Sequence, residues 1–198
     1  MTGVEGISTE SVSPLTERLR AWQQSGGGER LDSDLIEAIY GELRVIAAQR
    51  LARESGAALT PTELVHEIWM RLKPTAEPIG DRNAFLRLAS VAMRHLLVDQ
   101  ARERAAHKRQ AVMHTLTLPL FDGRHHESLD DDQLIDLDRS LAQMAMAHPR
   151  IAEAVSLRAF AGLDLAEVAD VLDVSLATAK RDLAFGRAWL RVALGQVD

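Results

Sequence analysis

The sequence contains no cysteine, and only 4% of its 198 residues are aromatic. Without cysteine the chain has no disulfide and no thiolate to bind a metal or attack a substrate, and a reducing compartment fits. Sparse aromatic and β-branched residues beside abundant Leu, Ala, Arg and Glu favour helices over sheet. No apolar run approaches the ~20 residues of a membrane helix, and residues 1–15 lack the pattern of a signal peptide. We therefore expect an all-α, cytoplasmic protein with no membrane span.

Charge is unevenly distributed along the chain. The net charge is −6, which by itself weakly opposes nucleic-acid binding. Residues 81–111 nevertheless carry seven Arg and Lys against three acids, and residues 175–197 carry four against one. Residues 122–138, between them, carry one Arg against seven acids. Two basic segments therefore flank an acidic one, and a basic helical segment is the electrostatic mark of nucleic-acid binding.

Hydrophobic periodicity, capping residues and Pro or Gly breaks predict helices along most of the chain. The predicted helices span residues 14–24, 32–54, 61–73, 82–110, 133–147, 149–160, 165–172 and 176–194. Residues 111–132 are polar and acidic and are predicted to be a linker, in which LTLPLF is a short extended piece. The prediction is two small helical domains, 13–110 and 133–198, joined by this acidic linker.

Residues 163–191 have the spacing of a helix-turn-helix. Asp164 and Ser175 are predicted to cap its two helices, and residues 172–174 form the turn, with Asp173 where glycine is usual. The N-terminal part of the second helix, with Asp182 on its outer face or rim, then faces outward, where a recognition helix meets the major groove. The candidate DNA contacts are Ser175, Thr178, Lys180, Arg181 and, farther along, Arg187. The alternative is a helical hairpin with a merely charged face.

Three segments in order carry a family resemblance: LTPTELVHEIWMRL, then residues 82–109, then residues 162–190. They resemble, respectively, the polymerase-docking helix, the −10 helix and the −35 domain of bacterial extracytoplasmic-function (ECF) sigma factors. The resemblance covers nearly the whole chain, from Leu15 to Leu194. It implies a sigma factor that binds core RNA polymerase, through the clamp of the largest subunit, and promoter DNA. It implies no cofactor and no bond chemistry, so the protein is not expected to be an enzyme.

The resemblance also implies roles for individual residues. Polymerase contacts would come from Glu63, Glu67 and Arg71. Contacts to the backbone of single-stranded −10 DNA would come from Arg82, Arg87, Arg94, Arg102, Arg104, Lys108 and Arg109. Asn83 and the loop 74–81 would capture a flipped base. Phe85, Met93 and Leu97 on the same helix are predicted to be core, and the last four cations are alternatively an ordinary solvated helix end.

The start of the polymerase-docking helix departs from the family pattern. The pattern typical of ECF sigma factors at this helix start is similar to Asp-Ala-Glu-Asp, whereas this chain has Thr60, Pro61, Thr62 and Glu63. Thr60, Pro61 and Glu63 also form a good helix start, with a cap, an N1 proline and a capping-box acid. A phosphate carries about −1.5 to −2 charge, so phosphorylation of Thr62, or of Thr60, by a Ser/Thr kinase would restore the missing charge. The alternative is that Thr60 is only a cap and Thr62 only a tolerated surface residue.

Enzyme and metal motifs are weak. His66-Glu67 begins like a zinc-protease motif, but position 70 is Met rather than the second His. His125-His126-Glu127 lies in the predicted linker and lacks a spaced third ligand, so no metal site is expected. The competing functional interpretation is a stand-alone helix-turn-helix regulator that binds duplex DNA without polymerase. A sequestering decoy that only resembles a sigma factor is a third alternative.

Overall fold

The computed structural model describes residues 13–24, 33–51, 61–72, 80–106, 116–118 and 127–194. Its elements are α1 (Pro14–Gln24), α2 (Ser33–Leu51), α3 (Pro61–Leu72), α4 (Arg82–Ala106), β1 (Leu116–Leu118), β2 (Glu127–Leu129), α5 (Asp131–Ala147), α6 (Pro149–Ala159), α7 (Leu165–Val171) and α8 (Leu176–Ala193). The predicted all-α class is confirmed, since the only other structure among these residues is two three-residue strands. Within this part of the chain, no helix is both long and apolar enough to cross a membrane.

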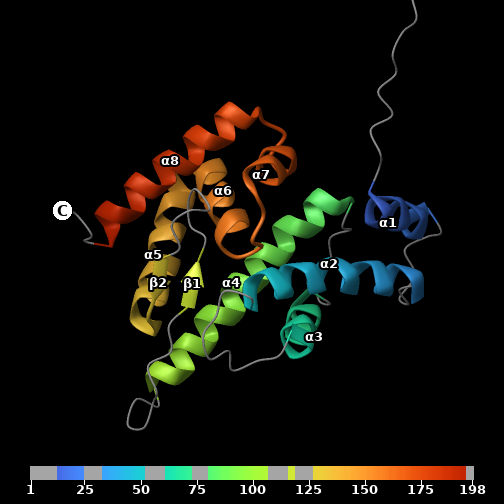
Figure 1. The fold of residues 1–198 in the computed structure, drawn as a ribbon, viewed down its shortest axis with the longest axis horizontal. Coiled ribbons are helices and arrows are strands. Elements are labelled where there is room, and N and C mark those ends of the chain that lie inside the picture. The colour runs from blue at the N-terminus through green and yellow to red at the C-terminus, as the bar shows by residue number, and fades with distance from the viewer. Residues whose placement is uncertain are drawn as a thin grey trace, which may run out of the picture.

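The long helix α4 lies between the other helices (Figure 1). It packs against α3 from the N-terminal half of the chain and against α5, α6 and α7 from the C-terminal half of the chain. The buried side chains of α4 explain how it packs against helices from both halves of the chain. Phe85, Leu86 and Met93 are fully buried, and further buried residues continue to Ala101. The prediction of Phe85, Met93 and Leu97 as core residues is confirmed.

Amphipathic spacing explains how α2 and α3 pack against each other and, through α3, on α4. Apolar side chains three or four residues apart lie on one face of a helix, and that face is buried. On α2 the buried residues include Leu35, Ile39, Leu43 and Ile46, and on α3 they are Leu64, Val65 and Ile68. The opposite face of α3 carries exposed polar residues, so this helix presents a polar surface outward.

Local capping defines the starts of the C-terminal helices. Asp130 accepts a hydrogen bond from Gln133 N at 2.8 Å, and Gln133 Oε1 accepts one from Asp130 N at 2.9 Å. This capping box starts α5 at Asp131, two residues before the predicted start. Asp164 and Glu167 form the same box at α7, which confirms the predicted cap. Other helix ends agree with the prediction to within one residue wherever the adjoining residues are described.

The predicted linker contributes to the core. β1 and β2 pair antiparallel, with Leu116 opposite Leu129 and Leu118 opposite Glu127. Leu118 and Leu129 are both fully buried. The extended piece predicted at LTLPLF is confirmed over Leu116–Leu118 as β1, and its last three residues lie outside the described residues. The partner strand was not predicted, because it is too short to show a period-2 pattern. These described parts of residues 111–132 are therefore packed structure rather than only a solvated spacer.

Gly186→Ala on α8 is expected to lower the free energy of unfolding by about 1 kcal/mol, because it overpacks the contact between α6 and α8. A Cβ at this position would lie 2.5 Å from Cγ2 of Val155 and 3.4 Å from Cγ2 of Ile151. Overpacking costs about 1–3 kcal/mol, which outweighs the gain in helix propensity of about 0.8–1.0 kcal/mol. Urea denaturation followed by circular dichroism measures the change.

Gly41→Ala on α2 is the matched control for this prediction. A Cβ at Gly41 would meet nothing within 4 Å. The same replacement is therefore expected to raise the free energy of unfolding by up to about 1 kcal/mol through helix propensity alone. A stabilising effect at both positions would show that α6 and α8 have room to separate at Gly186.

Candidate polymerase and nucleic-acid interfaces

The N-terminal part of α8 presents the predicted DNA contacts outward. Ser175 caps the helix, as predicted: its Oγ accepts a hydrogen bond from Thr178 N at 3.2 Å and lies 2.9 Å from Thr178 Oγ1. Asp173, in the preceding turn, has a φ of 52°, the left-handed conformation that Asp tolerates. Lys180 and Arg181 are exposed on the following turn, and Thr178 is partly exposed. Hydroxyl groups and two cations therefore share one exposed helix end.

Asp182 does not lie on that outer face, contrary to the prediction. It is only 7% exposed, and its carboxylate accepts two hydrogen bonds from Arg150 on α6, from Nε at 2.8 Å and from Nη2 at 3.2 Å. The hydrogen bond and charge of Asp182 raise the pKa of Arg150. Asp182 lies on the buried face of α8, next to Leu183, and its carboxylate therefore faces α6. Arg187, farther along α8, is partly buried.

The first predicted −10 residues, at the N-terminus of α4, contact other helices. Arg82 Nε donates to Glu42 Oε1 on α2 at 2.9 Å, and the backbone N of Arg82 donates to Thr16 Oγ1 at 3.1 Å. Burial opposes the charge of Arg82, but the hydrogen bond and charge of Glu42 leave its pKa raised. Asn83 Nδ2 donates weakly, at 3.4 Å, to the carbonyl oxygen of Asp170 on α7.

The remaining described cations of α4 contact the C-terminal helices. Arg87 forms an ion pair with Glu153 of α6, with 2.7 Å between Nε and Oε1. The geometry at Nε is not that of a hydrogen bond. Arg87 Nη2 donates a hydrogen bond to the carbonyl oxygen of Val171. Arg94 and Arg102 both contact Asp138 of α5, and Arg104 contacts Asp131 of α5 through Nε and Nη2. Lys108, Arg109 and loop residues 74–79 lie outside the described residues.

The carboxylates that pair with α4 were not identified as functional residues from the sequence. For Asp131 and Asp138 the available signal was the excess of acids over residues 122–138, opposite in sign to the excess over residues 81–111; Glu42 and Glu153 lie outside that segment. Charge counts cannot show which residues meet, because they contain no information on which helix faces pack together.

The exposed face of α3 holds the predicted polymerase contacts. Thr62, Glu63 and Glu67 are exposed. Arg71 is also exposed, and its Nη1 donates to Asp99 Oδ2 on α4 at 2.9 Å. Thr60 lies outside the described residues. Because α3 begins at Pro61, Thr62 lies in its first turn, where backbone N–H groups and the helix dipole favour negative charge.

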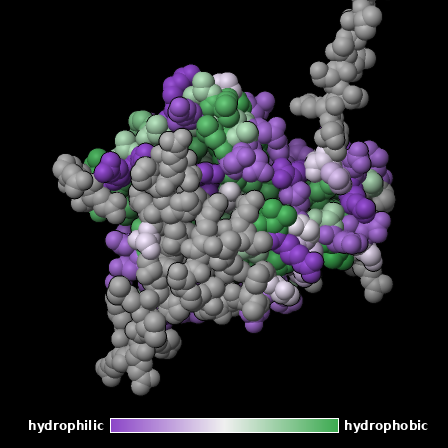
Figure 2. Space-filling view, viewed as in Figure 1, coloured by the Kyte–Doolittle hydropathy of each residue, from purple (hydrophilic) through white to green (hydrophobic). Residues whose placement is uncertain are grey.

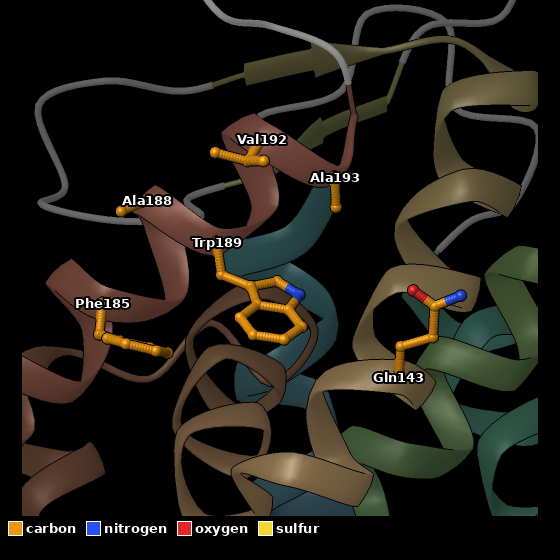
Figure 3. A pocket seen from close by; sticks show the side chains of 6 residues that line it. All are labelled: Gln143, Phe185, Ala188, Trp189, Val192 and Ala193. Carbon is orange, nitrogen blue, oxygen red and sulfur yellow. The ribbon is translucent and has the colours of Figure 1, made fainter.

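A separate apolar groove of about 420 Å³ lies between α5 and α8. Figure 3 shows Phe185 and Trp189 next to each other on α8, with Gln143 across from them on α5. The ring of His148 meets both aromatic rings edge-on, with centroids 4.9 Å from Phe185 and 5.7 Å from Trp189. In Figure 2, hydrophobic surface also gathers where Figure 1 draws α7 and α8. None of the predicted DNA contacts lines the groove, so α8 has two distinct surfaces.

The residues described hold no group of three or more His, Cys, Asp or Glu side chains that could bind a metal ion. An all-α fold with cations on α4 and at an exposed helix end of α8 is typical of a helical DNA-binding protein. A model of the ECF sigma factor family matches residues 15–196, and the chain therefore belongs to the ECF sigma factor family. No curated protein matches the chain. Members of this family bind core RNA polymerase and promoter DNA and direct transcription initiation.

Proposed function

We propose that this sigma factor divides its work between two domains. Residues 13–110 would bind the polymerase clamp and the −10 element, and residues 133–198 would bind the −35 element, with 111–132 between them. The order of the polar face of α3, the cationic helix α4 and the cationic end of α8 supports this division.

The observation that carries the proposal is the exposed N-terminal end of α8. Thr178, Lys180 and Arg181 lie there together, next to the Ser175 cap. An α-helix fits the major groove of B-DNA, and residues of its N-terminal turns reach the base edges while neighbouring cations meet phosphates. We assign the −35 contacts to these residues and the backbone N–H groups of the same helix end.

Phosphorylation of Thr62 is the proposed activating event, and a Ser/Thr protein kinase is the proposed partner. Thr62 is exposed in the first turn of α3, immediately before Glu63. A phosphate at this position would gain from the helix dipole and would add negative charge to the surface that meets the clamp. Thr62 is preferred to Thr60 because a hydroxyl at position 62 is not needed for capping.

Run-off transcription on genomic DNA fragments, with purified core polymerase and the full chain, tests the proposed function. We expect transcripts with defined 5′ ends that disappear when the protein is omitted, and more of them after treatment with the kinase. Strong duplex binding by the protein alone, with no transcript in any condition, would instead support the stand-alone regulator.

A further inference from the structure

The cations of α4 that would contact −10 DNA meet carboxylates of the C-terminal helices. The side chains of Arg87, Arg94 and Arg102 are seven and eight residues apart, a spacing that places them on one face of a helix. The acids on the other side are Asp131 and Asp138 on α5 and Glu153 on α6. We call these contacts the α4 seam. It adds charged contacts to the apolar packing of α4 on α5 and α6.

Asp138 is the centre of the α4 seam. Its Oδ1 accepts from Arg94 Nε at 2.7 Å, its carbonyl oxygen accepts from Arg94 Nη2 at 2.9 Å, and its Oδ2 accepts from Arg102 Nη2 at 3.1 Å. The side chains of Arg94 and Asp138 are only 16% and 18% exposed. Partly buried pairs are screened by salt much less than surface pairs, so we expect the contact between Arg94 and Asp138 to persist in ordinary buffers.

These guanidinium groups offer a carboxylate the same hydrogen bonds that they would offer a phosphate. Arg binds both anions through pairs of N–H groups in a fixed fork. Arg104 directs both Nε and Nη2 at the carboxylate of Asp131, whereas Arg94 directs Nε at the carboxylate and Nη2 at the backbone carbonyl oxygen of Asp138. A DNA phosphate approaching the same edge of either group would have to displace that aspartate first.

We propose that the cationic face of α4 is an anion-binding surface with two alternative partners. In the free protein it binds Asp131, Asp138 and Glu153 of the same chain, and in the transcription complex it binds DNA phosphates in their place. This inference rests on the proposed role of α4 in −10 binding. Only molecules in which the α4 seam is broken can bind DNA through α4. The apparent affinity for DNA is therefore reduced by a factor equal to the fraction of molecules in which the seam is broken.

Asp138→Asn tests the competition, and Asp136→Asn is its matched control. Asp136 lies on the same helix, and among the described residues its carboxylate pairs with Arg139 of α5, with both side chains more than half exposed. The two variants gain the same charge. Binding of short, mixed-sequence, fluorescein-labelled single-stranded DNA to the full chain is measured by anisotropy without polymerase. Asp138→Asn is expected to bind at least about fivefold more tightly than Asp136→Asn, the lower end of typical coupling between sites.

The separation of the two halves provides a second measurement that needs no DNA. The chain has no cysteine, so E37C on α2 and A184C on α8, both exposed positions, accept a fluorescent donor and acceptor selectively. Energy transfer in the free protein is expected to fall in Asp138→Asn and to stay at the wild-type level in Asp136→Asn. If thermal unfolding shows that Asp138→Asn is not folded, Asp131→Asn, which removes the partner of Arg104, replaces it.

Equal DNA affinity and equal energy transfer in the folded seam variant and the control would overturn the inference. Those outcomes are separate from failure of the proposed function, which is loss of factor-dependent transcripts with core polymerase. A protein that supports transcription but has no competition at the α4 seam refutes only the inference. A protein whose seam opens but which supports no transcription refutes the proposed function.

Discussion

Run-off transcription by Thr62→Glu is expected to exceed that by the unmodified wild type about tenfold, which corresponds to about 1.4 kcal/mol in polymerase docking. Glutamate places a negative charge in the first turn of α3, next to exposed Glu63. Interaction with the helix dipole stabilises the start of α3 in the free protein and in the complex alike, so it does not change docking. The ECF resemblance implies a basic clamp surface, and attraction of the new charge to that surface would supply the gain. A titration of core polymerase at fixed promoter concentration measures the change.

Thr62→Gln separates charge from size in this experiment, because glutamine has nearly the shape of glutamate without the charge. Both Thr62→Gln and Thr62→Ala are expected to match the unmodified wild type, and neither is expected to respond to the kinase. Equal activity of the unmodified wild type and Thr62→Glu would contradict activation by phosphorylation of Thr62. It would leave Thr62 as a surface residue of an otherwise active sigma factor.

Arg181→Ala is expected to weaken promoter binding by the complex with polymerase about tenfold, within the range of about 1–3 kcal/mol for a base contact. Arg181 is exposed in the second turn of α8, beside Lys180 and near the Ser175 cap. If Arg181 contacts a phosphate instead, the loss will be uniform across promoter sequences, and the slope of log affinity against log salt will decrease by about one. Filter binding at several salt concentrations distinguishes the two contacts.

Arg191→Ala provides the matched control for Arg181. Arg191 is an exposed arginine in the last turn of the same helix, so its replacement changes the net charge equally at the far end of α8. It is expected to leave promoter affinity within about twofold, because the nonspecific attraction of one distant charge is largely screened. Equal losses for the two variants would show that α8 does not approach DNA by its N-terminal end.

Local sequence signals predicted the helices well because their causes are local. Asp164 and Ser175 cap helices with hydrogen bonds to residues three positions away, and Asp173 takes the positive φ that the short turn requires. Side chains spaced at three or four residues sort into buried and exposed faces within each helix. The exposed candidates on α3 and α8 follow from the same sorting.

Such local signals could not predict the partners of Asp182 and of the arginines of α4. Each is polar and suitable for an exposed face, yet each meets an oppositely charged group from another part of the chain. Asp182 is 32 positions from Arg150, and Arg94 is 44 positions from Asp138. A helical period indicates which side of its own helix a residue occupies but not which helix packs on that side.

The sequence by itself determined the all-α class, the positions of most helix ends and the family resemblance that the family model confirms. These depend on backbone hydrogen bonds, caps and periodic apolar faces, all of which act over a few residues. Only the tertiary structure decided that Arg94, Arg102 and Arg104 pair with Asp138 and Asp131. Coulomb attraction has no preference for a partner until packing of the apolar faces brings particular charges within a few ångströms.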